Sequence, residues 1–489
     1  MTGKTVVLFE LEIGGTHLEI GLEIALTQAM AGNTVHYFLI PPRVLEPSPY
    51  EHYPQWIIPP LQLAIRVKHC LQGRTHHLRL VKKASRKAKK GGLDFHAEII
   101  KSLPLSSNLA NDFDPPDSLK ELVELNPRGT AMGVYLASSL ITISQNSQVV
   151  PSEHGSLMKE LVRKFDTTYS FAADAIARIR PDVVALYNGR FADSGGLVAA
   201  AERFRVEVFF HELEGYSGER YFFEPWRPHH WRKKAEVARI MWEELDFTAQ
   251  QQAIVAGKKL LADSRAAGGF INSFHRQSAD RTLLKSAKAK KLLVYYSTSS
   301  DEIASVPDVT ERSVYADQRV AILDLAERCR ELGIDFLVRV HPNTAKKSKA
   351  DRDLWDVDLG GLIGMEHVIR STDTLNSYDL LNRADVVATW GSSMGLEAVG
   401  HGVPTISMCD NIHLMAGADM LRVGHPRELT KKILEALSYV PNKESVTPYL
   451  YFLSHAGEKF VLFDSGTGGF WGIRPSFWSY LQDKRLLRK

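Results

Sequence analysis

Apolar and polar positions follow two different periods along this chain, and their order predicts an α/β protein. The run Thr5–Leu11 is rich in β-branched and aromatic residues and predicts a strand, whereas apolar residues at helical spacing from Leu18 to Ala29 predict a helix. A second strand is expected over Val35–Ile40. A strand, a helix and a strand in this order form a βαβ unit, in which the two strands are parallel.

The same alternation returns after residue 181 and again after residue 290. The expected strands are Asp182–Tyr187, Val206–Phe210, Lys291–Tyr296, Asp335–Val340, Asp385–Thr389 and Thr405–Met408. The expected helices are Leu119–Leu125, Leu157–Ile179, Leu197–Phe204, Gln318–Leu332, Tyr378–Arg383 and Leu396–Gly400. Strands that alternate with helices predict two Rossmann-like domains with parallel sheets, facing each other across a cleft.

The domain boundaries follow from shifts in composition. The polar, basic segment Ser278–Lys290 lacks a sustained apolar stripe and predicts the interdomain linker. We expect an N-terminal domain over 1–285, with a helical and basic insertion at about 58–170, and a C-terminal domain over 286–440. The aromatic and basic segment 441–489 is expected either to cross back onto the first domain or to lie on a membrane surface.

Composition narrows the class of protein. A chain of 489 residues, 44% of them hydrophobic, is long enough for two domains with buried cores. The net charge of +3 is too small for a protein that binds nucleic acid through bulk charge. Cys70, Cys329 and Cys409 are too few and too far apart for a disulfide framework. With no signal-peptide pattern and no apolar run of the ~18 residues that span a bilayer, we expect a cytoplasmic protein.

A basic block precedes residue 91. Ten Lys or Arg residues and no acidic residue lie between Arg66 and Lys90. Such a block is either a solvated helix face or a surface that contacts anionic lipid headgroups, a lipid diphosphate or an acidic glycan. Peripheral association with the inner face of the cytoplasmic membrane is therefore one expectation.

The residues that directly follow strands are the candidates for chemistry, because ligands of doubly wound sheets bind at the carboxyl ends of strands. His341 follows one predicted strand, with Arg339 and Asn343 beside it. Ser392 and Ser393 lie in a glycine-containing turn between a strand and a helix. Backbone N–H groups at a helix N-terminus bind anions, so this pattern predicts a phosphate site. Helix capping by serine is the alternative role.

The N-terminal half offers carboxylates and polar loops. Glu212 and Glu214 lie two residues apart, so both carboxylates point to one face if the strand continues that far. Polar or glycine residues in loops after the first strand and after Asp182–Tyr187 are candidates for acceptor binding: Gly15, His17, Asn188 and Arg190.

At these residues the sequence resembles a known group. The segments concerned are Arg339-Val340-His341-Pro342-Asn343, 389–398 and Gly402-Val403-Pro404, with Asn188-Gly189-Arg190 and 212–215 in the N-terminal half. They resemble bacterial capsule and surface-polysaccharide glycosyltransferases of the GT-B fold. The His-Pro and Ser-Ser pairs are also similar to those of the bacterial sialyltransferases and Kdo transferases, which use CMP-sugars.

The resemblance implies a metal-independent transfer of a sugar from a CMP- or UDP-linked donor to a glycan or lipid-linked acceptor, without a cofactor. It implies that His341 and the serine pair hold the donor phosphate and that an acidic pair before glycine supplies the base. Leu213 stands where the first acid of that pair is expected, so either Glu212 or Glu214 remains a candidate base. The other residues expected to support donor binding are Arg339, Asn343, Ser297, Thr298, Gly395 and Glu397.

Two other functions fit parts of the sequence. Gly391-Ser392-Ser393-Met394-Gly395 matches Gly-x-Ser-x-Gly, which would make Ser393 the nucleophile of a serine hydrolase. Its triad partners would come from Asp410, Asp419, His413, His425 and His455. A nucleotide- or polysaccharide-binding protein without activity is the third hypothesis. No metal site is expected, because the two Asp-x-Asp matches, 112–114 and 356–358, are short enough to arise by chance.

Overall fold

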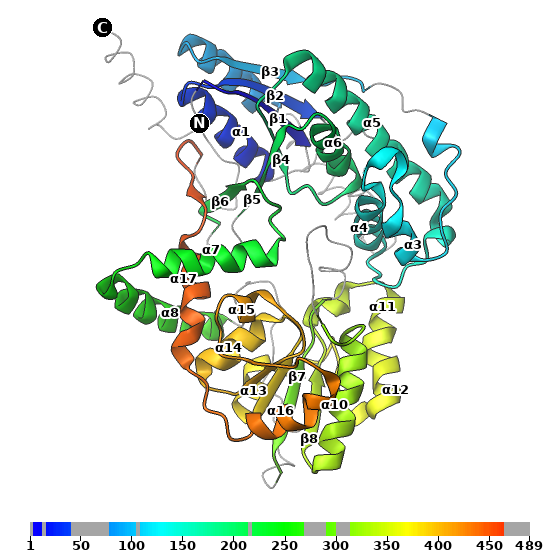
Figure 1. Ribbon diagram of the computed structural model, residues 1–489, viewed down its shortest axis with the longest axis vertical. Helices are drawn as coiled ribbons and strands as arrows, with labels where there is room; N and C mark the ends of the chain where they lie inside the picture. The colour runs from blue at the N-terminus through cyan, green and yellow to red at the C-terminus, as the bar shows by residue number, and fades with distance from the viewer. Residues whose placement is uncertain are drawn as a thin grey trace, which may run out of the picture.

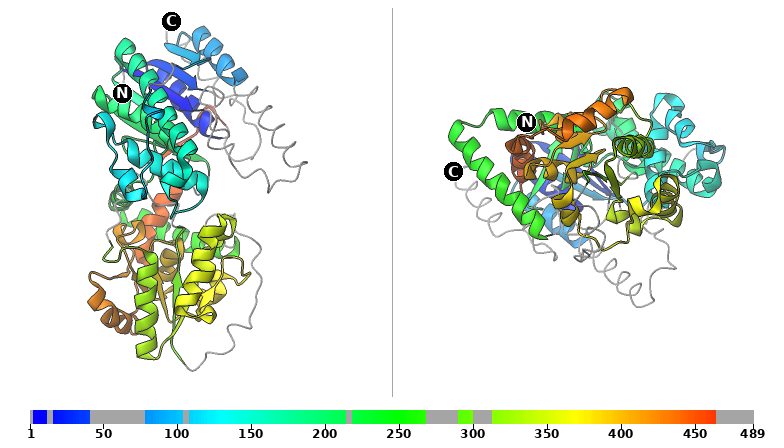
Figure 2. Two further views of the ribbon diagram at one scale, coloured as in Figure 1. Left: turned by 90° about the vertical axis from the view of Figure 1, so that its right-hand side faces the viewer. Right: turned by 90° about the horizontal axis from the view of Figure 1, so that it is seen from below.

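The computed structural model describes residues 3–11, 16–40, 78–103, 108–213, 218–267, 290–299 and 313–463. These residues form two lobes, each with helices packed on its own sheet (Figure 1; Figure 2). Both sheets are largely parallel. The predicted class, α/β with two Rossmann-like units of the GT-B kind, is confirmed.

The N-terminal lobe contains a sheet in the order β13-β6-β5-β4-β1-β2-β3. Its strands are β1 (Thr5–Leu11), β2 (Thr34–Ile40), β3 (Phe95–Ile99), β4 (Val183–Tyr187), β5 (Glu207–Leu213), β6 (Arg220–Glu224) and β13 (Glu458–Lys459). The five strands from β3 to β5 pair in parallel, and β6 and β13 are antiparallel additions. Pairing with β6 extends β5 three residues beyond its predicted end, so Glu212 lies opposite Phe222 within the ladder.

Helices cover both faces of this sheet. They are α1 (Thr16–Met30), helix 78–90, α3 (Leu119–Glu124), α4 (Met132–Ser144), α5 (Gly155–Ile179) and α6 (Ala192–Arg203). Alternate residues of β1 divide between two cores: Val6 and Leu8 pack with α1 and helix 78–90, and Val7 and Phe9 pack with α4, α5 and α6. This division is the period-2 pattern that the sequence shows.

The C-terminal lobe contains an entirely parallel sheet in the order β12-β11-β10-β7-β8-β9. Its strands are β7 (Leu292–Tyr296), β8 (Asp335–Arg339), β9 (Val368–Ile369), β10 (Val386–Thr389), β11 (Thr405–Ser407) and β12 (Leu421–Arg422). Its helices are α10 (Gln318–Leu332), α11 (Lys349–Asp353), α12 (Leu359–Ile363), α13 (Ser377–Arg383), α14 (Ser393–His401), α15 (Ile412–Met415) and α16 (Leu429–Ala436).

Three helices connect the lobes. Helices α7 (Trp231–Glu243) and α8 (Phe247–Ala267) follow the N-terminal sheet in the chain and pack against α15 and α14 of the C-terminal lobe. Helix α17 (Thr447–His455) returns from the C-terminal lobe and packs on both of them (Figure 1). The chain then pairs as β13 with β6, and Phe460, Leu462 and Phe463 enter the core of the N-terminal lobe.

A buried carboxylate holds this returning segment in place. Glu23 on α1 is fully buried, and its two oxygens accept hydrogen bonds of 2.6–3.0 Å from the backbone N–H groups of Val461, Leu462 and Phe463. The N-terminal lobe is therefore completed by residues from the far end of the described chain.

Some predictions concern residues outside this description: Gly15, Glu214, Cys70, residues 278–289 of the linker and residues 464–489 of the tail. Among the residues described, no helix combines the length and apolar character needed to cross a membrane.

Candidate functional site

The loop after β7 joins two of the candidate motifs of the C-terminal lobe. Strand β7 lies between β8 and β10, so the loops that follow these three strands are neighbours. The hydroxyl of Ser297 accepts a hydrogen bond from the backbone N–H of His341 at 2.9 Å, and Thr298 Oγ1 accepts one from Gly391 at 3.2 Å. The His-Pro motif and the serine turn, residues 390–395, thus both bond to the two residues that directly follow β7.

His341 has a defined orientation. Its Nδ1 accepts a hydrogen bond from the backbone N–H of Asn343 at 3.2 Å and caps the 3₁₀ helix Pro342–Lys346. An Nδ1 that accepts leaves the proton of the neutral ring on Nε2. Nε2 is therefore the atom with which His341 can donate to a ligand.

The serine turn ends at the N-terminus of α14. The hydroxyl of Ser392 accepts from Met394 N at 3.4 Å, so Ser392 is the N-cap of α14. Ser393 is the first helical residue and is exposed to solvent. Gly395 allows α14 to approach β10, because a Cβ at this position would lie 2.5 Å from Cγ2 of Thr389. Ser392 therefore has the capping role considered for the serines, and Ser393 is exposed beside it.

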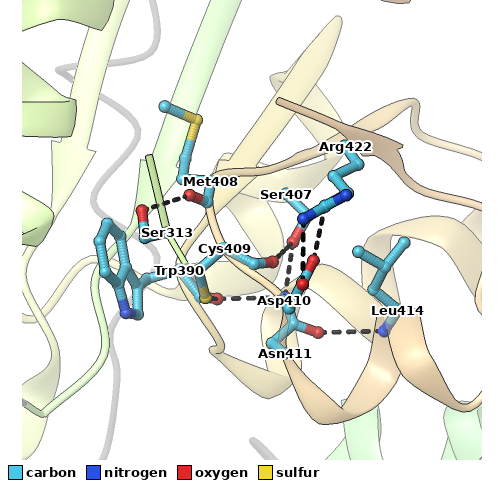
Figure 3. A network of polar contacts seen from close by, with 9 residues as sticks. All are labelled: Ser313, Trp390, Ser407, Met408, Cys409, Asp410, Asn411, Leu414 and Arg422. Carbon is cyan, nitrogen blue, oxygen red and sulfur yellow. Dashed lines mark hydrogen bonds and ion pairs between the residues drawn. The ribbon is translucent and has the colours of Figure 1, made fainter. Parts of the chain in front are cut away.

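Buried hydrogen bonds from Cys409 and Asn411 fix the backbone of the serine turn at Trp390 (Figure 3). The carbonyl oxygen of Trp390 accepts hydrogen bonds from Cys409 Sγ at 2.7 Å and from Asn411 Nδ2 at 3.1 Å. Asn411 also donates to Ser407 Oγ at 2.7 Å, and its Oδ1 caps α15 by accepting from Leu414 N at 3.0 Å. Because Asn411 is completely buried, these bonds fix the path of the turn.

Two predicted donor-binding residues lie inside the lobe and bond to protein groups. Arg339 is 2% exposed, and its guanidinium donates to the carbonyl oxygens of Arg370 and Asp373. Glu397 is 1% exposed and accepts a hydrogen bond from the hydroxyl of Tyr378. Burial raises the pKa of Glu397 to about 7. The structure gives these two residues contacts that hold the fold.

In the N-terminal lobe, a buried asparagine holds Glu212. Asn188 follows β4 with a positive φ of 56°, and its Nδ2 donates to Glu212 Oε2 at 2.7 Å. The same amide lies 3.1 Å from Nε2 of His229, which must accept because an amide nitrogen only donates. Burial, followed by the charges of Arg190 and Lys234, lowers the pKa of His229 to about 3, in agreement with a neutral ring.

His17 lies on the other side of Glu212. Its Nδ1 is 3.5 Å from Glu212 Oε1, and its ring packs on Tyr187 with centroids 4.2 Å apart. Burial lowers the pKa of His17, although Glu212 acts in the opposite direction. Arg190 is 8% exposed and donates from Nε to Ser138 Oγ at 2.7 Å. His17, Asn188 and Glu212 are thus brought together.

Sequence reasoning missed part of this cluster. His229 stands in a loop before α7 and does not follow a predicted strand, so its position in the sequence gives no signal. Glu10 on β1 and His211 on β5 form a fully buried pair, 3.5 Å from Oε2 to Nε2, and burial lowers the pKa of His211 to about 4. The signal for Glu10 was available, since an acid inside an apolar strand is rarely buried without a partner.

The two groups of candidate residues are connected through the start of α7. Trp231 is two residues from His229, and its ring contacts the serine turn: a Cβ added to Gly391 would lie 3.3 Å from Cη2 of Trp231. Helix α7 itself packs against α15, which Asn411 caps. The Glu212 cluster consists of His17, Asn188, Glu212 and His229. It is therefore connected to the serine turn through His229 and its near neighbour Trp231.

The triad proposed for a serine hydrolase finds no support in these contacts. Its aspartates and histidines have other partners: Asp410 with Arg422, Asp419 with Tyr439 and Asn442, His413 with Gly391, His425 with Arg427 and His455 with Tyr451. None of these described contacts reaches Ser393. Within the described ranges, no three His, Cys, Asp or Glu side chains form a group that could hold a metal ion.

No protein-family model and no curated protein sequence matches the chain. Among solved structures, it is similar to a Thermosulfurimonas dismutans KpsC, a β-Kdo 2,4-transferase, at 12% identity and a TM-score of 0.34 over 55% of this chain and 78% of that one.

Two other solved structures align with most of the chain. A Listeria monocytogenes putative UDP-N-acetylglucosamine 2-epimerase gives 12% identity and a TM-score of 0.26 over 94% of this chain and 93% of that one. The calicheamicin glycosyltransferase CalG4 gives 11% identity and a TM-score of 0.27 over 93% of this chain and 94% of that one. With TM-scores this low, these likenesses do not bear on the chemistry of this chain.

Proposed function

We propose that the chain is a glycosyltransferase that moves a sugar from a nucleotide sugar to a hydroxyl group of a glycan or a lipid-linked acceptor in the synthesis of a bacterial surface polysaccharide. The observation that carries the proposal is the junction after β7, where Ser297 binds the His341 backbone and Thr298 binds that of Gly391. An imidazole and a helix N-terminus at one sheet edge suit the phosphate of a nucleotide.

The C-terminal lobe stabilises the leaving group. When the bond between the anomeric carbon and the phosphate oxygen breaks, both bonding electrons remain on that oxygen. The Nε2–H of His341 donates to the phosphate, as do the hydroxyl and backbone N–H of Ser393 at the start of α14. Fixed donors that point at developing charge are among the largest contributions to catalysis. The donor is a CMP- or UDP-sugar, and no cation is required in this scheme.

The N-terminal lobe activates the acceptor. The acceptor hydroxyl oxygen forms the new bond to the anomeric carbon, and its proton goes to the carboxylate of Glu212. Asn188 orients that carboxylate through Nδ2. Glu214, the other predicted base, lies outside the described residues. We propose that the reaction takes place in the cytoplasm, at the inner membrane face.

The test compares two histidines that share one local motif. His341 and His425 each precede a proline and cap a 3₁₀ helix through Nδ1, but only His341 adjoins the Ser297 loop. Thermal unfolding is measured with CMP-, UDP-, GDP- and CDP-linked ligands, because a ligand that binds the native state raises Tm. We expect one nucleotide class to raise Tm in the wild type and in His425→Ala, and His341→Ala to lose that shift.

Transfer is then assayed with the nucleotide sugar that binds. We expect His341→Ala to lower kcat by roughly 10²–10³-fold, the effect of removing one donor to a developing anion. His425→Ala should keep wild-type turnover. The proposal fails if no nucleotide raises the Tm of the wild type, or if His341→Ala turns over at the wild-type rate.

A further inference from the structure

A cavity lies at the edge of the N-terminal sheet, outside the site described above. It has a volume of about 810 Å³ and lies between β2, β3, the end of helix 78–90 and the end of α5. His36 and His96 stand near the amino ends of β2 and β3. The candidate base Glu212, by contrast, lies near the carboxyl end of β5. In Figure 1, β2 and β3 are in the part of the upper lobe that faces away from the C-terminal lobe.

The lining of this cavity is rich in hydrogen-bond donors. Four elements contribute one nitrogen-bearing side chain each: His36, His96, Lys89 and Arg178. Ser85 adds a hydroxyl, and Glu98 is the one acidic side chain in the described lining. Apolar side chains, among them those of Phe38 and Phe95, complete the wall.

The two histidines form a defined pair. Their rings stack with centroids 4.9 Å apart and 22° between planes. Asp94 accepts from His96 Nε2 at 2.7 Å and from Thr34 Oγ1 at 2.5 Å, which fixes the His96 ring. Burial, followed by the neighbouring His96, lowers the pKa of His36. A neutral His36 can donate one N–H without repelling the ring stacked on it.

The surface beside the cavity is strongly basic. Helix 78–90 places Leu80, Val81, Ala84 and Ala88 in the core of the lobe. Its remaining positions carry seven cations and no acid: Arg79, Lys82, Lys83, Arg86, Lys87, Lys89 and Lys90. Lys89 belongs both to this face and to the cavity lining, so the positive surface continues into the cavity.

We propose that this cavity binds a phosphate group. Donors converge from four elements, which matches the several acceptor oxygens of a phosphate better than the two of a planar carboxylate. Lys89 and Arg178 supply two positive charges against the one negative charge of Glu98, and the other cations of helix 78–90 add positive charge beside the cavity. A phosphomonoester, which carries about −1.5 to −2 at neutral pH, fits this balance. The apolar wall accommodates the organic part of the ligand. The phosphate belongs either to a lipid headgroup or to a soluble phosphomonoester.

The experiment measures binding alone and uses charge reversals at exposed positions, where the fold is least affected. Lys89→Glu and Arg178→Glu remove the two cavity charges, and Lys431→Glu on α16 is the matched control in the other lobe. All three are made in a His341→Ala background, so that the proposed donor site does not contribute. Glycerol 3-phosphate is titrated by calorimetry, and phosphatidylcholine vesicles with or without phosphatidic acid are used for cosedimentation.

We expect each cavity variant to bind at least roughly tenfold more weakly than the background protein, and Lys431→Glu to bind equally well. If the cavity variants lose only vesicle binding, the ligand is a lipid headgroup. If they lose binding of glycerol 3-phosphate, the ligand is a soluble phosphomonoester. The inference is overturned if neither probe binds the background protein, or if cavity variants and control bind alike. Because no sugar donor or acceptor is present, these outcomes are separate from the outcome for glycosyl transfer.

Discussion

His413 of α15 and Tyr449 of α17 meet edge to face, with ring centroids 4.9 Å apart and 78° between planes. Tyr449 stacks on Phe452 and Phe452 stacks on Phe222, each pair at 5.8 Å. Phe222 is the cross-strand partner of Glu212, while the backbone N–H of His413 donates to Oδ1 of Asn411, whose amide nitrogen donates to the Trp390 carbonyl of the serine turn. One stack of rings therefore supports both halves of the candidate site.

Replacing Tyr449 tests this stack. Tyr449→Leu removes two ring contacts, each worth about 0.5–1.5 kcal/mol beyond buried area, so we expect the free energy of unfolding to fall by about 1–3 kcal/mol. Tyr449→Phe keeps the ring and serves as the control. Urea unfolding measures the difference. Equal stability of the two variants would contradict a structural role for the stack.

The contact between Asn188 and Glu212 predicts a change in the pH profile of transfer. Asn188→Asp places a second carboxylate where Nδ2 now donates, and two carboxylates in contact repel each other when both carry a negative charge. Activity should then need a higher pH, because the base must be ionised to accept a proton.

The control for this change is Asn188→Leu, which removes the donor without adding charge. We expect it to lower kcat with a smaller displacement of the acid limb of the profile. Glu212→Gln should lower kcat by roughly 10²–10⁴-fold, the usual contribution of a general base. An unchanged acid limb in Asn188→Asp would show that Glu212 is not the base.

Glu397 predicts a loss of stability with rising pH. Burial raises its pKa to about 7, whereas an unfolded glutamate titrates near ~4.3. Between these two pH values, the native state keeps a proton on Glu397 that the unfolded chain has lost. The contribution of Glu397 to the free energy of unfolding is therefore complete below about pH 4 and is lost as pH rises through 7, by on the order of 3 kcal/mol.

Glu397→Gln cannot ionise and should therefore be more stable than the wild type at pH 8, with a flatter profile between pH 5 and 8. Glu366→Gln, at a side chain that is 75% exposed, is the control. Guanidinium unfolding at several pH values gives both profiles. Parallel profiles for the wild type and Glu397→Gln would show that Glu397 titrates normally.

The sequence predicted the parallel sheets well, because long apolar strands and the helices between them have strong periodic signals. Strand β1 has the predicted bounds, Thr5–Leu11, and α10 has the predicted bounds, Gln318–Leu332. Short antiparallel additions were missed, since β13 has two residues, Glu458–Lys459, and exists only because the chain returns to β6. A pairing between residues more than two hundred positions apart leaves no local pattern.

The candidate site shows the same limit. Positions directly after strands could be predicted, and His341 and the serine turn do adjoin the Ser297 loop. The inward direction of side chains could not be predicted: Arg339 and Glu397 share those motifs but bond to Arg370 and Tyr378 inside the lobe. His229 was missed because its link to Asn188 depends on a loop that folds back over β4 and β5.

The hydrogen bonds between Glu23 and the returning segment 461–463 predict that a substitution of Glu23 destabilises the fold. Glu23→Gln replaces one carboxylate oxygen by an NH₂ group that faces the backbone N–H groups of 461–463. A buried donor left without an acceptor costs about 1–3 kcal/mol, so we expect a destabilisation of that size and faster amide exchange at Leu462 and Phe463.

Glu19→Gln on the same helix is the matched control. Burial raises the pKa of Glu19 to about 8, so this carboxyl is already largely neutral at pH 7 and the amide should cost little. Hydrogen exchange and urea unfolding at pH 7 measure both variants. Equal losses in the two would mean that the hydrogen bonds to the returning segment contribute nothing specific.

The contact between Trp231 and Gly391 predicts that nucleotide affinity depends on a residue of the connecting helix α7. A Cβ at Gly391 would lie 3.3 Å from the indole and 3.6 Å from Cβ of Asn411, and Asn411 is held by its hydrogen bonds. Gly391→Ala must therefore move either the turn or Trp231. Because the hydrogen bonds of Asn411 and the size of the indole restrict this adjustment, we expect a cost of about 1 kcal/mol, or roughly fivefold in Kd if the turn moves.

The double variant separates the two causes. Trp231→Phe lacks the outer indole ring that carries Cη2, so it makes room for the added methyl group. If the contact positions the turn, Gly391→Ala with Trp231→Phe should bind the nucleotide more tightly than Gly391→Ala alone, and the coupling energy is read from the four dissociation constants. Additive effects would show that Trp231 and the serine turn respond independently, and that the lobes are not coupled at this point.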